Sequence, residues 1–88
     1  MLKLRSSIVL KTVNANCIYA LDCEDESSFF FKFEGVSKIF IEYVHKGTNQ
    51  DKLLSEVKSF FPDVSSQQIE GDFEDFLQTI RTHKLLAP

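Results

Sequence analysis

The chain has 88 residues, a net charge of −3 and 43% hydrophobic residues. This length accommodates one hydrophobic core, so we expect a single domain over residues 1–88. Proteins that rely on phosphate contacts usually carry an excess of basic residues, which this chain does not have. No stretch approaches the ~20 apolar residues of a membrane span, and the early apolar run at residues 8–10 is too short for a signal peptide. We therefore expect a cytoplasmic protein in which Cys17 and Cys23 are reduced thiols.

Three short strands are predicted within residues 7–34. Two β-branched or aromatic runs, SIVLKTV and CIYAL, are separated by NAN, which is a turn signal. The acidic turn DCEDES then leads to an aromatic strand near residues 28–34, in the text SSFFFKFEG. This spacing indicates an antiparallel meander of three strands.

The rest of the chain has apolar residues every three or four positions, which is typical of amphipathic helices. We expect helices near residues 36–46, 49–61 and 66–84, with Gly47 ending the first and Ser65 capping the third. The order β-β-β-α-α-α predicts an α+β fold whose helical half resembles a winged helix. The residues expected to face the core are Val36, Ile39, Phe40, Tyr43, Val44, Leu53, Leu54, Val57, Phe60, Phe61, Ile69, Phe73, Phe76, Leu77 and Ile80.

Side chains that commonly carry catalysis or bind metals are few and dispersed. His45 and His83 have no second ligand at helical spacing, and five residues separate Cys17 from Cys23. A zinc site needs three or four converging ligands, and a cysteine nucleophile needs a base within reach. The three glycines form no phosphate-binding loop. We therefore predict that the protein is not an enzyme and has no metal site and no cofactor.

The first turns of the third helix are acidic. They carry Glu70, Asp72, Glu74 and Asp75, which we expect to interact favourably with the positive end of the helix dipole. In a winged-helix DNA-binding protein this helix enters the major groove, where four carboxylates repel the phosphates. The ten lysines and arginines are dispersed and form no basic stripe. A winged-helix DNA-binding regulator is therefore the alternative hypothesis, and we expect no nucleic-acid partner.

The aromatic strand has apolar side chains on both faces. By alternation, Phe29, Phe31 and Phe33 point toward the core, whereas Phe30 and Lys32 point away from it. If strand order follows the chain, this strand is a sheet edge, and proteins normally protect an apolar edge with charge. Two interpretations stay open: a core strand, or an edge that a peptide or a second copy of the chain joins through main-chain hydrogen bonds.

The sequence from the third strand to the C-terminus resembles the PqqD-like family, also called RiPP recognition elements. The matching segments are FFFKFEG, IFIEYVHKGTNQDKLLSEVKSFFPDV and QQIEGDFEDFLQTIRTHKLL. The residues that fit the family's last motif are Asp72, Phe73, Phe76, Leu77, Ile80, Leu85 and Leu86. The sequence departs from the family's pattern in three places, because Glu34, Lys46 and Lys84 stand where the family has Asn, Asp and Gly.

The resemblance implies a non-catalytic domain that binds the leader of a ribosomally made precursor peptide and presents it to a separate modifying enzyme. In this family the leader lies antiparallel to the third strand, in a groove between that strand and the third helix. Carried over by position, the strand contacts are Ser28, Phe29, Phe30, Phe31 and Lys32. At 100° per residue, one flank of the core stripe on the third helix carries Asp72, Asp75, Phe76 and Thr79, and we predict that this flank supplies the helix contacts. The opposite flank of the helix, with Glu70, Glu74 and Arg81, is the alternative.

Overall fold

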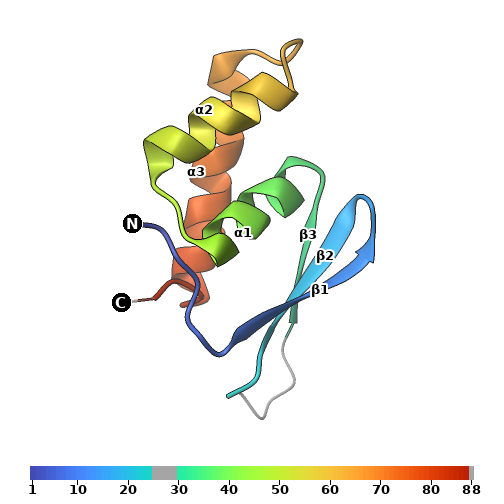
Figure 1. Cartoon of the computed structure of the whole chain (residues 1–88), viewed down its shortest axis with the longest axis vertical. Coiled ribbons are helices and arrows are strands. Elements are labelled where there is room, and N and C mark those ends of the chain that lie inside the picture. Colours follow the sequence, from blue (N-terminus) through green and yellow to red (C-terminus); the bar gives the residue numbers. More distant parts are fainter. Residues whose placement is uncertain (25–29, 88) are drawn as a thin grey trace.

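The computed structural model describes residues 1–24 and 30–87. Its elements are β1 (Ile8–Asn14), β2 (Cys17–Asp22), β3 (Phe30–Glu34), α1 (Val36–Lys46), α2 (Gln50–Phe60) and α3 (Ser66–Thr82). Figure 1 shows the three helices gathered on one side of the sheet. The predicted α+β fold, three antiparallel strands followed by three helices, is confirmed.

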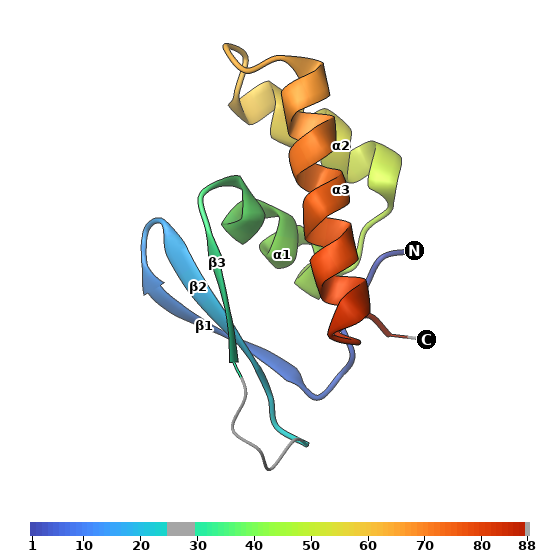
Figure 2. The same ribbon diagram turned by 180° about the vertical axis from the view of Figure 1, so that it is seen from behind.

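The sheet is an antiparallel meander with the strand order β1-β2-β3. β2 pairs with both neighbours, and its register with β3 runs from Leu21 opposite Phe30 to Cys17 opposite Glu34. Within the described residues, β2 is the one strand that pairs with β3. Figure 2 shows that α3 lies on the other side of β3 from β2. The third strand is therefore a sheet edge, as the sequence indicated.

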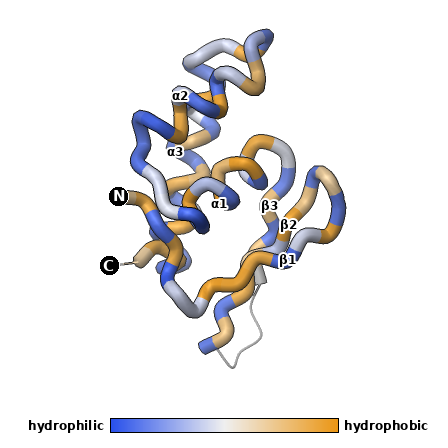
Figure 3. The backbone as a smooth tube through the Cα atoms, in the orientation of Figure 1, coloured by the Kyte–Doolittle hydropathy of each residue, from blue (hydrophilic) through white to orange (hydrophobic). Residues whose placement is uncertain are grey.

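A cluster of buried side chains joins the sheet to the helices. Its aromatic centre is formed by Phe40, Phe73 and Phe76, whose ring centroids lie 5.3 to 6.3 Å apart. Phe33 extends this centre from β3, with its ring edge-on to Phe76 at 5.7 Å. Figure 3 shows hydrophobic and hydrophilic residues alternating along α1 and α2, which matches the amphipathic pattern in the sequence.

Two core assignments on the helices need correction. Phe60 was expected to face the core, but it is 58% exposed. It is the last residue of α2, and Phe61 leaves the helix at φ −127° and packs against the core instead. Ile41 was not expected in the core and is fully buried. α1 packs against β3, α2 and α3 at once, so it buries more of its circumference than one stripe.

Local capping residues set the helix boundaries. The side chain of Asn49 accepts a hydrogen bond from the N–H of Lys52, and that of Ser65 accepts one from the N–H of Gln68. Gly47 ends α1 at φ 91°, where a residue with a Cβ is strained. The predicted end of the first helix and start of the third are thus confirmed.

The two termini are tied to the body of the fold. Leu4 forms an isolated β-bridge with Leu86. Arg5 donates a hydrogen bond from Nε to the carbonyl of Lys84 at 2.6 Å, and its guanidinium forms an ion pair with Asp22 at the end of β2. One side chain therefore connects the N-terminal segment, the sheet and the chain beyond α3.

The end of α3 is a Schellman motif. The N–H of Leu85 donates to the carbonyl of Ile80 at 2.8 Å, and the N–H of Lys84 donates to that of Arg81 at 3.1 Å. Lys84 has φ 58°, a left-handed conformation that favours glycine. The PqqD-like pattern has glycine at this position, so the departure in the sequence falls at a strained backbone position.

We expect Lys84→Gly to stabilise the protein by about 0.5–1 kcal/mol. A left-handed lysine costs roughly 1–2 kcal/mol, and the greater freedom of glycine in the unfolded chain offsets part of the gain. Urea denaturation measures the change. Glu74→Gly, at an exposed position within α3, is the matched control and is expected to lose about 1 kcal/mol. Equal losses in both variants would contradict the assigned backbone geometry.

Candidate functional site

The open edge of β3 presents main-chain groups to solvent. The N–H of Gly35 donates to the carbonyl of Asn16 at 3.1 Å. This bond identifies which residues of β3 direct their main-chain groups toward β2. Bonded and non-bonded pairs alternate along an antiparallel ladder. The residues whose main-chain groups point toward the open edge are therefore Phe30, Lys32 and Glu34.

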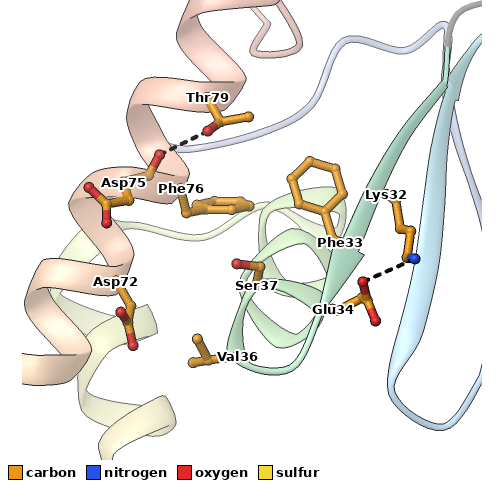
Figure 4. A pocket seen from close by; sticks show the side chains of 9 residues that line it. All are labelled: Lys32, Phe33, Glu34, Val36, Ser37, Asp72, Asp75, Phe76 and Thr79. Carbon is orange, nitrogen blue, oxygen red and sulfur yellow. Dashed lines mark hydrogen bonds and ion pairs between the residues drawn. The ribbon is translucent and has the colours of Figure 1, made fainter.

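A groove of about 330 Å³ lies between this edge and α3 (Figure 4). The rings of Phe33 and Phe76 lie between the strand and the helix, and both residues are buried. The residues that line the groove are Lys32, Phe33, Glu34, Val36, Ser37, Asp72, Asp75, Phe76 and Thr79. Strand addition with side-chain selectivity requires two features: a main chain that is open on one side, as this edge is among the residues that the structure describes, and a floor that selects side chains.

The α3 wall of the groove is acidic. Asp72 accepts a 3.5 Å hydrogen bond from Gln68, and the hydroxyl of Thr79 donates to the main-chain carbonyl of Asp75 at 3.0 Å. Neither Asp72 nor Asp75 forms an ion pair with another residue in the described part of the chain. Two carboxylates are therefore available to a cationic group in the groove.

The helix dipole does not account for these carboxylates. The sequence suggested that acidic residues at the start of the third helix interact with its dipole, but the first turn of α3 contains no acidic residue. The dipole effect falls off within the first turn. The dipole therefore does not explain the presence of Asp72 and Asp75 on the groove wall.

The β3 wall carries one ion pair on its outer face. Lys32 Nζ lies 3.1 Å from Glu34 Oε1, and the two side chains are 50% and 55% exposed. The hydrogen bond from Lys32 to Glu34, with the charge of that carboxylate, raises the pKa of Lys32. Figure 4 shows this pair on the strand, away from the aromatic floor.

The inner face of β3 meets the C-terminal end of α3. Phe31 lies against His83, with ring centroids 4.3 Å apart. From the sequence, His83 is only a candidate metal ligand without a second ligand at helical spacing, and no sequence signal links it to the strand 52 positions earlier. It also lines a second cavity of about 310 Å³, which shares Asp75 and Thr79 with the groove. The groove thus continues along α3 toward its C-terminal end.

A third cavity, of about 270 Å³, extends the groove toward the start of α3. It shares Val36 and Asp72 with the groove and adds the apolar side chains of Ile39, Phe61 and Ile69. Sequence reasoning assigned Val36 to the core and did not consider it for the site. The surface beside β3 is therefore polar toward one end of α3 and apolar toward the other.

The structure brings most of the predicted contact residues together. The predicted residues that line the groove are Lys32, Asp72, Asp75, Phe76 and Thr79. Phe31 lies on the inner face against His83. Phe30 is described through its main chain, which pairs with Leu21. Ser28 and Phe29 lie outside the described residues.

The alternative flank of α3 does not line the groove. Its residues Glu70, Glu74 and Arg81 are absent from the lining. Glu70 instead lies 3.0 Å from the Nζ of Lys58 on α2. The geometry thus favours the flank that contains Asp72 and Asp75.

Within residues 1–24 and 30–87, no group of three His, Cys, Asp or Glu side chains is placed to hold a metal ion. The helices of that part of the chain are too short or too polar to cross a membrane. Cys17 is buried and Cys23 is exposed, and both are free thiols.

The sequence matches no protein-family model and no curated protein. Its structure is similar to one solved as TbiB1 in complex with the TbiA(beta) leader peptide. The TM-score is 0.79 at 17% sequence identity, over 96% of this chain and 93% of that chain. At this identity the likeness concerns the fold. It confirms the fold that the resemblance to the PqqD-like family implied.

Proposed function

We propose that this chain is a non-catalytic protein that captures the leader of a ribosomally made precursor peptide and presents the peptide to a separate modifying enzyme. The leader adds as a strand to the open edge of β3, antiparallel to it, and lies in the groove between β3 and α3. Ribosomal peptides are made in the cytoplasm, so the proposal assigns the protein to that compartment.

The observation that carries the proposal is the edge of β3, which pairs with no strand other than β2 in the described part of the chain, beside a groove with an aromatic floor. Lys32 and Glu34 direct main-chain groups toward the groove, and Phe33 and Phe76 lie beneath it. The likeness to TbiB1, which was solved with a leader peptide, supports leader-peptide binding by this chain.

The expected affinity is moderate. Strand pairing supplies roughly 0.5–1.5 kcal/mol per hydrogen bond, and burial of an apolar leader side chain supplies roughly 1.5–3 kcal/mol. Ordering a flexible leader costs about 2–5 kcal/mol. We expect the balance of these terms to give a dissociation constant on the order of 1 μM, which corresponds to about −8 kcal/mol.

The test is a titration of the protein into a fluorescently labelled leader from a precursor peptide encoded beside it, followed by anisotropy. Saturable binding near the micromolar range is expected. Labelled duplex DNA serves as the control and is expected to remain unbound, because Asp72 and Asp75 repel phosphates at the groove. Salt-sensitive binding of DNA without binding of the leader would favour the alternative hypothesis of a winged-helix DNA-binding regulator.

Reversing the charge of the α3 wall is expected to weaken leader binding. Asp72→Lys combined with Asp75→Lys removes the attraction for a basic leader residue, and the loss is larger at low salt because the groove is open to solvent. Anisotropy at two salt concentrations measures it. The matched control, Glu70→Lys with Glu74→Lys, makes the same change in net charge on the other flank. A larger loss in the control would move the contact to that flank.

A second copy of the chain is the alternative occupant of the same edge. If β3 pairs with its own copy, the mass in solution rises with protein concentration, and added leader lowers it again. Sedimentation with and without leader separates this dimer from a monomer that binds peptide only.

A further inference from the structure

The outer face of β3 carries two opposite charges at alternate positions. Lys32 and Glu34 are both about half exposed and lie 3.1 Å apart. Both residues also direct their main-chain groups toward the open edge. A strand that bonds to this edge therefore places its own side chains directly opposite these two charges.

Directly opposite residues in an antiparallel ladder interact. Hydrogen-bonded partners have Cα atoms about 5.5 Å apart, and opposite charges at such positions are favourable whereas like charges are not. The position opposite Glu34 thus favours a basic residue, and the position opposite Lys32 favours an acidic one.

The position between them faces the other way. Side chains alternate along a strand, so the residue opposite Phe33 points to the inner side of the sheet. There it meets the rings of Phe33 and Phe76, which form the floor of the groove. An apolar side chain fits this position, because it buries its surface against these two rings.

The direction of the added strand sets the order of these residues. In antiparallel addition, the residue opposite Glu34 comes before the residue opposite Lys32 in the peptide. We propose that the protein selects a peptide segment with the consecutive pattern basic, apolar, acidic, read from the N- to the C-terminus. This inference rests on the proposed function and names the class of peptide that the groove takes.

A selection from a displayed library of random short peptides tests the inference. The immobilised full chain is expected to enrich the basic-apolar-acidic pattern. The double variant Lys32→Glu with Glu34→Lys keeps the ion pair and its exposure, and it is expected to enrich the acidic-apolar-basic pattern. Synthetic peptides that differ only in the order of the two charges should then bind the wild-type protein with a roughly tenfold preference, inverted in the double variant.

The outcomes separate this inference from the proposed function on which it rests. If the selected peptides lose binding to the Lys32→Pro variant but show no preferred order of the two charges, the inference is wrong and binding at the edge of β3 stands. The same conclusion follows if the wild-type protein and the double variant prefer the same order. An acidic-first order on the wild-type protein would overturn the antiparallel direction. Absence of any enrichment, or binding that survives Lys32→Pro, would overturn the proposed function and the inference together.

Discussion

Replacement of Lys32 by proline is expected to weaken leader binding by about tenfold or more while the protein stays folded. The N–H of Lys32 points to the open edge, so its loss removes a hydrogen bond to the leader, and the proline ring occupies the space that the leader main chain needs. Edge strands tolerate proline where the N–H faces solvent. Calorimetry gives the dissociation constant, and circular dichroism on heating checks the fold.

Two matched controls isolate the role of the main chain. Lys32→Ala removes the charge but keeps the N–H, so it is expected to cost at most about 1 kcal/mol of binding. Thr12→Pro makes the same main-chain change on the far edge of the sheet. Cys23 donates to the carbonyl of Ser7 at 2.9 Å, which by alternation directs the N–H of Thr12 to the open side of β1. Strand addition to β3 is contradicted if Lys32→Pro binds as tightly as Thr12→Pro.

The second large effect concerns stability. Phe76→Ala is expected to lower the free energy of unfolding by about 3–5 kcal/mol, because Phe76 is 3% exposed and its ring contacts Phe33, Phe40 and Phe73. The free energy of unfolding of a domain of this length is roughly 4–13 kcal/mol, so the expected loss is a large fraction of the total stability. Urea denaturation measures the change.

Phe60→Ala is the matched control for the core assignment. Phe60 is 58% exposed at the end of α2, so the same truncation is expected to cost less than about 1 kcal/mol. If the two variants lose similar amounts, Phe60 packs more closely than the structure indicates, and the sequence-based assignment of Phe60 to the core was sound.

The fold was largely predictable because its signals are local. The change of apolar period after Gly35, the cap at Ser65 and the helix end at Gly47 each depend on a few neighbouring residues. The choice between Phe60 and Phe61 is different. Both lie at helical spacing from Val57, and the exit of the chain from α2 decides which ring is buried.

The candidate site was less predictable from the residues themselves. Alternation on β3 separated the inward Phe33 from the outward Lys32, but the flank of α3 that faces the strand was left as two alternatives. That choice depends on how α3 crosses the sheet, which is a long-range property. The contact of Phe31 with His83 depends on the same crossing and leaves no pattern in the sequence.

An amide NMR titration of the labelled full chain with the leader of a precursor peptide encoded beside it shows whether the leader binds in the groove between β3 and α3. We expect shifts concentrated at residues 30–34 and 72–83 with the leader, and none with duplex DNA. Shifts that the leader causes only in β1 or on the exposed face of α2 would contradict leader binding in the groove. Salt-sensitive shifts with DNA and none with the leader would contradict the function.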